Sequence, residues 1–313
     1  MKKALIVRFS SLGDVVLTSV LFEPLLSAGY KPYLLTFSPY DELFVDDERV
    51  VAIGINKENF FEEIKRIPRD FELKIDLHKN LRSLILRFFL RGKWRSYKKE
   101  SLRRRLAIYF KAFRKPYFVP EAYAGSVKDL IPVKNLRPFI KVSEKRVESF
   151  KKELGDYIVL APGARYKKKR YPYFKELAEL FIEKGEKVVI VGDERDYELT
   201  KDFPGINLCG RLRLIEVLSI IKGAKLFVGN DSGLLHCARA VKTPAVQIYG
   251  ATHPTLGFSL YPDEGLVIFK NLDCQPCDLH GKGECKRGDF ACLEISPITI
   301  FERIYKNLEL QQK

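Results

Sequence analysis

Short apolar runs alternate with segments of helical periodicity along almost the whole chain. In the first half, the runs that predict strands are residues 4–7, 33–37, 50–53, 72–76 and 94–97. The helical segments between them are residues 14–28, 58–67, 81–91 and 101–114. Pro24 should kink or restart the first of these helices. Strands that alternate with helices favour a parallel sheet, so we expect an α/β fold.

The second half repeats this alternation and predicts a second doubly wound sheet. Its expected strands are residues 157–160, 187–191, 206–208, 225–228, 245–248 and 266–268. Its expected helices are residues 173–184, 193–203, 214–222 and 232–240. Residues 131–138 are typical of an extended linker, followed by a helix at 143–154. The length of 313 residues also predicts about two domains. We place them at 1–145 and 155–295, with a last helix at about 296–309.

Neither a membrane span nor a signal peptide is predicted. The chain has no apolar run of about 18 residues. The apolar stretch at 4–7 is too short for the core of a signal peptide. We therefore expect a cytoplasmic protein.

The segment after the strand at 225–228 combines the features of a phosphate site. Asp231 ends the strand, and Ser232 and Gly233 begin a helix whose first N–H groups can accept a phosphate. Asp231 can cap that helix or hold a ligand hydroxyl, and His236 lies one helical turn further on. The alternative is a capped helix with a core histidine, because Asp and Ser are common N-cap residues.

A second turn of small residues follows the strand at 4–7. Residues 8–14 have the sequence RFSSLGD and lead into an apolar helical run. Asp14 therefore lies where open α/β sheets bind ligands, beyond the carboxyl ends of their strands. The turn lacks Gly-x-Gly-x-x-Gly and does not support a dinucleotide site. Ser10 and Ser11 are more typical of helix caps than of nucleophiles, since no histidine lies near them in sequence.

A third turn is strongly basic. The strand at 157–160 ends in a Pro-Gly turn, and five basic residues follow by residue 170, Lys169 among them. A cationic loop beside a sheet edge suits a diphosphate, although charge runs are usually solvated faces. After the next strand, Asp196 and Glu194 are candidates for binding ribose hydroxyls.

In these turns the sequence resembles glycosyltransferase family 9, the heptosyltransferases of lipopolysaccharide core synthesis. RFSSLGD (8–14) is similar to the family's Ser-x-Gly-Asp turn, and APGARYKKKRYP (161–172) to its His-Pro-Gly-Ala and Lys-x-Trp-Pro loop. GNDSGLLHCA (229–238) and YGATHP (249–254) are similar to its Asp-Ser/Thr-Gly-x-x-His and Gly-x-Thr-Asp-Pro elements. The four segments occur in the family's order and at its separations, and the resemblance covers almost the whole chain.

The chain departs from the family pattern at three positions. Ala161, Tyr171 and His253 stand where the family has His, Trp and Asp, which affects substrate detail more than activity. The resemblance implies a GT-B fold, in which two Rossmann-like domains with parallel sheets face each other across a cleft. It also implies that the last helix, within residues 296–313, packs back onto the first domain.

We expect the C-terminal domain to bind a donor. The resemblance implies ADP-heptose, whereas the residues alone imply only a nucleotide diphosphate. The expected donor contacts are Lys169, Asp196, Asp231, Ser232, Gly233 and His236. The helix dipole and the lysine would stabilise the leaving group, so no cofactor is required, and a divalent cation is left open.

We expect the N-terminal domain to bind the acceptor. Asp14 would remove the proton from the acceptor hydroxyl as it attacks the anomeric carbon, and a single displacement inverts the configuration there. Ser11, Gly13 and Arg82 are the expected acceptor contacts. His78, at a strand end, is more typical of a capped strand terminus than of an acceptor contact.

Basic charge is concentrated between Lys79 and Lys115, with fourteen Lys and Arg against one acid. Helical spacing predicts two core-facing stripes there, made by Leu81, Leu84, Ile85, Phe88 and Phe89, and by Leu102, Leu106, Tyr109 and Phe113. The charge fits nucleic acid, an anionic membrane surface or an anionic soluble substrate. No nucleic-acid-binding signature occurs. A Kdo-bearing lipid A precursor would satisfy the other two explanations, with the protein peripheral at the inner face of the inner membrane.

Four of the six cysteines, Cys274, Cys277, Cys285 and Cys292, fall within 19 residues. A C-x₂-C pair followed by two cysteines can hold a structural zinc. The last two are seven positions apart, however, and lack the second knuckle of a zinc ribbon. Two disulfides or reduced thiols are the alternatives, and a cytoplasmic location disfavours disulfides.

Two further functions compete with the transferase. A sugar-nucleotide epimerase can share the two-domain architecture but has no anionic lipid to hold, so the basic region argues against it. A non-enzymatic binder of nucleic acid or membrane would use that region but leaves the three turns unexplained. Fold alone does not decide among these functions.

Overall fold

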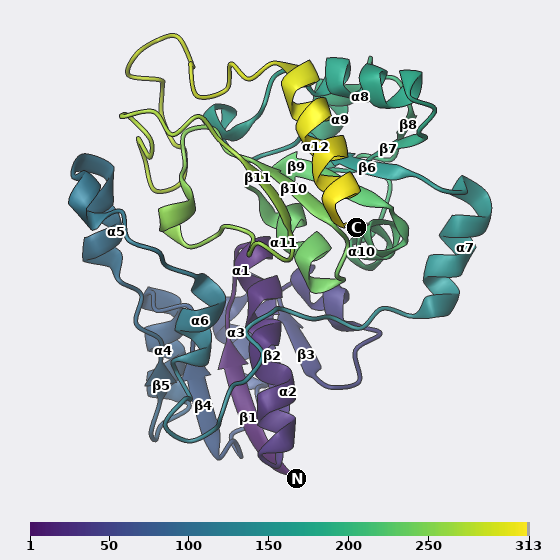
Figure 1. Cartoon of the computed structure of the whole chain (residues 1–313). Helices are drawn as coiled ribbons and strands as arrows, with labels where there is room; N and C mark the ends of the chain where they lie inside the picture. The colour runs from purple at the N-terminus through teal and green to yellow at the C-terminus, as the bar shows by residue number, and fades with distance from the viewer. Residues whose placement is uncertain (312–313) are drawn as a thin grey trace. The chain divides into compact units, whose positions relative to one another are not determined.

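The computed structural model describes residues 1–311, with side chains described to residue 307, and it divides into two compact units. The first unit comprises Met1–Lys99, Val119–Ser143 and Arg213–Leu218. Its sheet has the order β3-β2-β1-β4-β5, and all neighbouring strands are parallel (Figure 1). The strands are β1 (Lys2–Val7), β2 (Tyr30–Phe37), β3 (Val51–Ile55), β4 (Leu73–Asp76) and β5 (Arg95–Ser96). The predicted parallel sheet is confirmed.

The helix expected over 14–28 is interrupted, as Pro24 predicts. It comprises α1 (Leu12–Leu17), a 3₁₀ turn (Thr18–Leu21) and α2 (Phe22–Ser27). Pro24 lies in the first turn of α2, where its missing N–H costs no intrahelical hydrogen bond. The other α-helices of this unit are α3 (Phe60–Lys65), α4 (Leu81–Phe89) and α6 (Val119–Ala124), the last of which no sequence pattern predicted.

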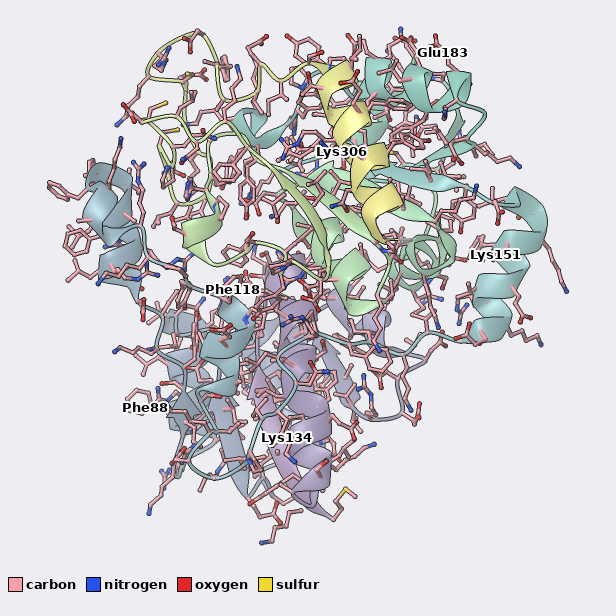
Figure 2. All side chains as sticks on the ribbon, in the orientation of Figure 1. Phe88, Phe118, Lys134, Lys151, Glu183 and Lys306 are labelled. Carbon is pink, nitrogen blue, oxygen red and sulfur yellow. The ribbon has the colours of Figure 1, made fainter. Side chains whose placement is uncertain are left out.

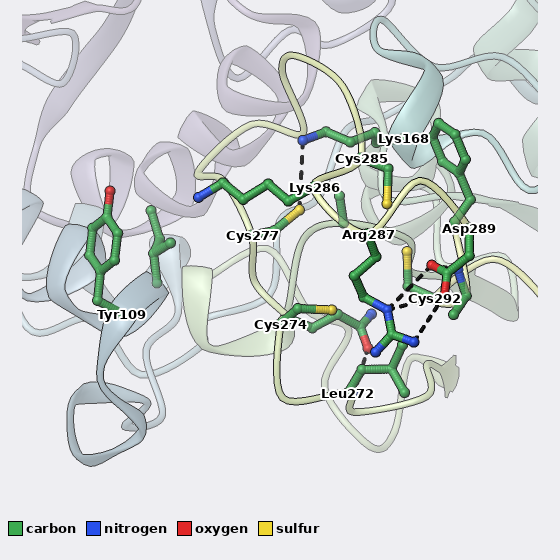
Figure 3. A pocket seen from close by; sticks show the side chains of 15 residues that line it. Tyr109, Lys168, Leu272, Cys274, Cys277, Cys285, Lys286, Arg287, Asp289 and Cys292 are labelled. Atoms are coloured by element: carbon green, nitrogen blue, oxygen red, sulfur yellow. Dashed lines mark hydrogen bonds and ion pairs between the residues drawn. The ribbon is translucent and has the colours of Figure 1, made fainter.

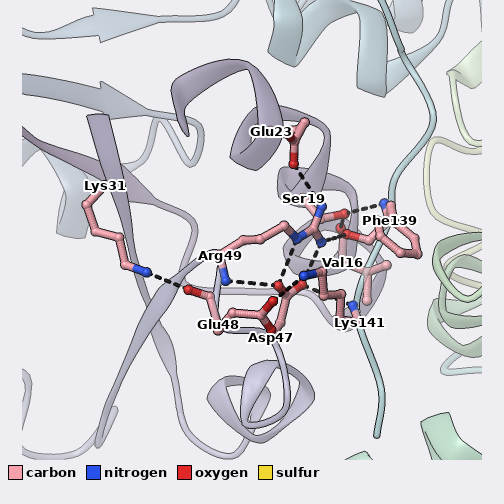
Figure 4. A network of polar contacts seen from close by, with 9 residues as sticks. All are labelled: Val16, Ser19, Glu23, Lys31, Asp47, Glu48, Arg49, Phe139 and Lys141. Carbon is pink, nitrogen blue, oxygen red and sulfur yellow. Dashed lines mark hydrogen bonds and ion pairs between the residues drawn. The ribbon is translucent and has the colours of Figure 1, made fainter. Parts of the chain in front are cut away.

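The chain that leaves the first unit is tied to it by polar contacts. Arg49 donates from Nη2 to the carbonyl of Phe139 at 2.7 Å and forms an ion pair with Asp47 at 2.6 Å. Asp47 also accepts the N–H of Lys141 at 3.1 Å, and Ser19 accepts that of Phe139 at 3.0 Å (Figure 4). Residues 139–141, which follow the predicted linker, are therefore held by polar contacts to residues of the first unit.

The second unit comprises Glu100–Phe118, Glu144–Leu212 and Ser219–Lys313. Its parallel sheet has the order β11-β10-β9-β6-β7-β8, as the alternating pattern predicted. The strands are β6 (Ile158–Ala161), β7 (Val188–Ile190), β8 (Ile206–Asn207), β9 (Leu226–Asn230), β10 (Ala245–Ile248) and β11 (Gly265–Ile268). The helices of this half of the chain are α7 (Glu144–Leu154), α8 (Phe174–Glu183), α9 (Glu194–Thr200), α10 (Leu214–Gly223), α11 (Gly233–Ala240) and α12 (Pro297–Gln311).

The last helix, α12, packs on the second unit, so the prediction that it crosses back onto the first domain is wrong. Ile300 and Ile304 are buried in the core of the second sheet. Phe301 lies against Phe181 of α8, with ring centroids 5.4 Å apart. Figure 1 shows α12 in yellow beside α8. The apolar side of α12 is therefore buried within the second unit.

Residues 100–118 belong to the second unit, and the predicted first domain at 1–145 is wrong for this segment. It contains α5 (Ser101–Tyr109) and a 3₁₀ turn (Lys111–Phe113). Arg104 is buried beneath α5, with its guanidinium over the ring of Phe258 at 5.5 Å. Phe118 stacks on Tyr261 with centroids 4.4 Å apart. Aromatic contacts of this kind are not readable from helical periodicity.

The two predicted apolar stripes are also wrong in part. In α4, Leu81, Leu84 and Phe88 are exposed, and Figure 2 shows Phe88 at the surface, whereas Ser83 and Leu86 are buried. In α5, the exposed positions include Leu102 and Tyr109, and the buried ones are Arg104 and Ala107. The stripe assignment assumed that the apolar side faces the core, and here arginine–aromatic stacking occupies the inner side of α5 instead.

Among the described residues, we find no helix that combines the length and the apolar character needed to cross a bilayer.

Candidate functional site

The first unit holds Asp14 at the carboxyl end of its sheet. β1 ends at Val7, and the following turn leads into α1, where Asp14 lies in the first turn. Its carboxylate forms an ion pair with Arg8 at 2.7 Å and accepts the hydroxyl of Ser11 at 2.8 Å, both on Oδ2. The hydroxyl of Tyr123 donates to Oδ1 at 3.3 Å. The side chain is 15% exposed, so the carboxylate is held in place yet still reachable.

Arg8 and Tyr123 are site residues that the sequence analysis missed. Burial alone would lower the pKa of Arg8, but the charge of Asp14 and smaller contributions from Tyr123 and Tyr97 together outweigh it, and the net shift is upward. Burial raises the pKa of Tyr123 well above its ordinary value, so its hydroxyl stays a donor. Arg8 was visible in the RFSSLGD motif as the one cation in the same short segment as Asp14. Tyr123 gave no signal, since it lies 109 residues away on the unpredicted α6.

His78 follows β4, the neighbour of β1 in the sheet. Asp76 accepts the backbone N–H groups of His78 and Lys79, each at 2.9 Å, which confirms the interpretation as a capped strand terminus. The Nδ1 atom is buried without a hydrogen-bond partner among the described residues. Burial, and then the charge of Arg8, lower the pKa of His78 to about 4, so the ring is neutral at pH 7. Contact with an acceptor stays a prediction.

The three residues expected to contact the acceptor lie in or near this edge of the first sheet. Ser11 is exposed and Gly13 is buried within α1. The guanidinium of Arg82 lies over the ring of Phe37 at 5.7 Å, at the end of β2. Phe37 in turn stacks on Phe9, which follows β1, with centroids 4.9 Å apart. Acceptor binding by these residues stays a prediction.

The second unit brings Lys169 and Asp231 together. Asp231 follows β9, Lys169 ends the 3₁₀ turn Lys167–Lys169 after β6, and β6 and β9 are neighbours. Lys169 Nζ lies 2.8 Å from Asp231 Oδ2. Thr252 donates its hydroxyl to the same oxygen at 2.7 Å, and Gln247 donates to Oδ1 at 3.3 Å. Burial opposes ionisation of Asp231, but the charge of Lys169 and the hydrogen bonds from Lys169 and Thr252 together outweigh it, so the pKa of Asp231 is lowered.

Thr252 and Gln247 were also missed, although Thr252 belongs to the YGATHP segment. The YGATHP segment follows β10, and its Thr252 brings a hydroxyl to the carboxylate of Asp231 at the end of β9. With this threonine, Asp231 has three donors around a side chain that is only 6% exposed.

The basic turn after β6 is more than a solvated loop. Asn230, fully buried at the end of β9, donates to the carbonyl of Pro162 at 2.7 Å and accepts the N–H of Tyr171 at 2.9 Å. It thereby joins the two ends of the turn. Lys168 is buried, and its ammonium donates to the carbonyl of Glu284 at 3.2 Å. Lys169 is therefore presented by a turn with fixed ends.

The start of α11 fits the predicted phosphate site in part. Ser232 is the N-cap residue, with extended backbone and no capping hydrogen bond from its side chain. Ser232 and Gly233 are half-buried, whereas the helix from Leu235 onward is buried. His236 is buried, with Nδ1 3.3 Å from Arg239 and its ring against Phe258. This placement favours the core-histidine alternative, and a donor contact by His236 stays a prediction.

Asp196 lies at the carboxyl ends of β6 and β7. It completes a capping box at the start of α9, where its Oδ2 accepts the N–H of Asp193 at 3.0 Å. Burial raises the pKa of Asp196. A Cβ at Gly163 or Gly192 would overlap with this side chain, so both glycines are needed to admit it. Glu194, the other ribose candidate, is exposed on the same turn.

The four clustered cysteines line one cavity of about 140 Å³ in the second unit (Figure 3). All are free thiols. Burial raises the pKa of Cys292 to about 11, whereas three backbone N–H groups outweigh burial and lower the pKa of Cys285. Over residues 1–311 we find no group of three or more His, Cys, Asp and Glu side chains that could hold a metal ion. The structural zinc stays a prediction.

The two α/β units with parallel sheets, each carrying an ion-paired carboxylate at the carboxyl end of its strands, have the architecture of the GT-B fold. Residues 61–285 match the family model described as glycosyltransferase family 9 (heptosyltransferase). The chain belongs to this family, as its motifs indicated.

Similar proteins carry heptosyltransferase names. Lipooligosaccharide heptosyltransferase 2 of Haemophilus influenzae is 29% identical over 219 residues, which cover 61% of this chain and 63% of the relative. Lipopolysaccharide heptosyltransferase 2 of Escherichia coli K12 is 34% identical over 110 residues, or 31% of this chain and 32% of the relative. The matched segments thus span less than two thirds of either relative.

Solved structures match over a greater length. The E. coli ADP-heptose LPS heptosyltransferase II has a TM-score of 0.76 at 21% identity and covers 100% of both chains. The E. coli heptosyltransferase WaaC with ADP has a TM-score of 0.73 at 19% identity and covers 97% of this chain and 99% of its own. These likenesses establish the fold.

Proposed function

We propose that this chain is an inverting heptosyltransferase that moves heptose from ADP-heptose to an anionic inner-core acceptor of lipopolysaccharide. Family membership and the names of its relatives support the reaction class. A solved neighbour described as WaaC with ADP supports the adenosine diphosphate part of the donor. The observation that carries the proposal is Asp14, a reachable carboxylate with three neighbouring donors at the end of the first sheet.

On the donor side, Lys169 is the residue that we propose contacts the diphosphate. Its ammonium is held by Asp231, which is itself fixed by Thr252 and Gln247. A lysine in a preorganised position loses little freedom when an anion binds. The half-buried helix start at Ser232 and Gly233 adds partial positive charge beside the same sheet edge.

On the acceptor side, Asp14 takes the proton from the attacking hydroxyl. The acceptor oxygen forms a bond to the anomeric carbon while the bond from that carbon to the diphosphate oxygen breaks, and the electron pair leaves with the nucleoside diphosphate. One displacement of this kind inverts the anomeric configuration. Tyr123 and Ser11 orient the carboxylate, and Arg8 compensates its charge.

We propose that the charge of the leaving diphosphate is neutralised by Lys169 and the start of α11, so that a divalent cation is not required. Activity should then persist in excess EDTA. Loss of turnover in EDTA that added Mg²⁺ restores would overturn this part of the proposal.

We further propose that the acceptor is an anionic glycolipid and that the enzyme works at the cytoplasmic face of the inner membrane. The cluster of basic residues between Lys79 and Lys115 supports an acceptor with carboxylates and phosphates. Arg82 at the sheet edge is the proposed first contact with such a group.

The test is a transfer assay with purified protein, ADP-heptose and a de-acylated Kdo-bearing acceptor, followed by mass spectrometry and by NMR of the new anomeric centre. The proposal expects one heptose added with inverted configuration. Conversion of the nucleotide sugar without any acceptor would instead favour an epimerase. If the protein binds neither ADP sugars nor UDP sugars, a non-enzymatic binder is favoured instead.

A further inference from the structure

The segment 101–115 presents its largest apolar side chains to solvent. Leu102 is 72% and Tyr109 is 71% exposed, and Phe110 and Phe113 are exposed as well. Leu102 and Tyr109 are seven residues apart on α5 and therefore lie on one face of the helix, with exposed Arg105 between them. Apolar residues grouped in this way on a surface mark an interaction site.

The same segment is fastened to its unit through its arginines. Buried Arg104 lies over the rings of Tyr117 and Phe258, at 5.7 and 5.5 Å. Arg103 donates to the carbonyls of Phe113 and Lys115, each at 3.1 Å. Arg104 and Ala107 occupy the inner face of α5, the large apolar side chains point outward, and the contacts of Arg103 and Arg104 hold the segment in this arrangement.

Charge selects the partner. Residues 101–115 contain six Lys and Arg and no Asp or Glu. Arg105 and Lys115 are exposed beside the apolar residues. Aromatic and leucine side chains interleaved with Lys and Arg match the headgroup region of an anionic bilayer, where rings enter the interface and cations meet lipid phosphates. A soluble anionic ligand would use the cations but would leave the exposed rings without a partner.

We propose that residues 101–115 form an interfacial segment that docks the second unit on an anionic lipid bilayer. It deepens the proposed function by naming the segment that contacts the membrane, and it rests on that function only for the lipid that carries the acceptor. Docking needs neither donor nor acceptor. The segment lies in the donor-binding unit, so it adds a membrane contact that the basic charge of α4 in the first unit does not provide.

The test is co-sedimentation of the whole chain with vesicles of phosphatidylcholine, with and without 30% phosphatidylglycerol (about one lipid in three, enough for a negative surface potential), in the absence of any acceptor. The test variant combines Leu102→Ser, Tyr109→Ser and Phe110→Ser. A second variant combines Arg105→Glu and Lys115→Glu. The matched control combines Val45→Ser, Phe61→Ser and Ile182→Ser, three exposed apolar residues outside the segment.

We expect the wild type to bind only the anionic vesicles, and less at high salt. The apolar triple variant should bind at least about 10-fold more weakly, the charge variant about 25-fold more weakly, at about 5-fold per reversed cation, and the control like wild type. Circular dichroism verifies folding of each variant. Wild-type protein that ignores anionic vesicles, a triple variant that binds like wild type, or a control that loses binding would each overturn the proposal.

Transfer to a de-acylated, soluble acceptor separates this inference from the proposed function. The triple variant should keep wild-type turnover with that acceptor and lose it only on acceptor embedded in vesicles. If the wild type fails to transfer to the soluble acceptor yet binds anionic vesicles, the proposed function fails and the docking inference stands.

Discussion

The carboxylates of Asp14 and Asp231 have similar surroundings and different exposure. Each lies at the carboxyl end of a parallel sheet and pairs with one cation, Arg8 at 2.7 Å and Lys169 at 2.8 Å. Each also accepts hydroxyl hydrogen bonds. Asp14 is 15% exposed, and its neighbours Ser11 and His78 are exposed and half-buried, respectively. The side chain of Asp231 is only 6% exposed and has three donors around it.

The difference in exposure indicates that the two carboxylates have different roles. A base must reach the proton that it removes, which the exposure of Asp14 permits. An enclosed carboxylate with three donors serves to hold a partner, and Asp231 holds Lys169. The two cations differ in the same way: Arg8 is buried and compensates charge, while the side chain of Lys169 is 17% exposed and can meet a ligand.

Replacing Asp14 by Asn should have the largest effect. The amide keeps the size of the side chain but cannot take the proton, so turnover should fall by about 10³-fold or more. The measurement is the initial rate of heptose transfer at saturating donor. Glu121→Gln, on the same unit, serves as a control and should stay near wild type. Turnover within a few fold of wild type in D14N would rule out its role as the base.

Asp231→Asn should mainly destabilise the protein. It leaves the largely enclosed ammonium of Lys169 without its countercharge, and breaking a pair with a buried carboxylate in this way costs about 3 kcal/mol. Urea unfolding at pH 7 measures the loss. Asp129→Asn removes the partner of Arg95 at an exposed site and should cost less than about 1 kcal/mol. Equal losses of unfolding free energy in the two variants would show that Asp231 stabilises the fold no more than a carboxylate in an exposed ion pair does.

His78 should make stability depend on pH. Its pKa is about 4 in the folded protein and near 6.5 when unfolded, so the unfolded chain binds more protons between these values. Stability present above pH 6.5 is therefore lost as the pH falls toward 4, by about 2 kcal/mol after allowance for partial exposure.

The measurement compares urea unfolding of the wild type and His78→Gln at pH 7.5 and 4.5. The variant should lose about 2 kcal/mol less than the wild type over this range. Identical pH dependence of the two proteins would refute the assignment of a neutral, buried ring beside Arg8.

Tyr123→Phe should have the smallest effect. It removes one hydroxyl that donates to Asp14 at 3.3 Å, and a single hydrogen bond of this kind contributes about 1 kcal/mol. Turnover should fall about 5-fold with donor affinity unchanged. A shift in donor affinity instead would mean that Tyr123 acts on the second unit's ligand.

Periodicity predicted the sheets well because a buried parallel strand is a continuous apolar run with few alternatives. All eleven strands of the described chain fall on predicted runs. It failed for α6, whose six residues VPEAYA carry no amphipathic signal. It also misplaced residues 100–118 and α12, since a helical stripe says that one face is covered but does not say by which unit.

Site residues were predictable where they lie together in a short motif in a turn. Asp14, Lys169 and Asp231 stand in short motifs at strand ends, and the structure places Lys169 beside Asp231. Tyr123 and Gln247 were not predictable, because their contacts join segments distant in sequence. His236 is buried against Phe258, and its contact with the donor stays a prediction, since a histidine one turn inside a helix faces the core as readily as a ligand.

The most direct test of these separate roles, Asp14 as the base and Lys169 as the donor contact, measures donor binding and transfer in both Asp14→Asn and Lys169→Ala. For each, calorimetry gives the affinity for ADP and ADP-heptose, and single-turnover kinetics with saturating donor give the rate of transfer. The account predicts that D14N binds donor like wild type but transfers at least about 10³-fold more slowly. K169A should bind the diphosphate about 10-fold to 100-fold more weakly. Weakened donor binding in D14N, or unchanged donor binding in K169A, would contradict it.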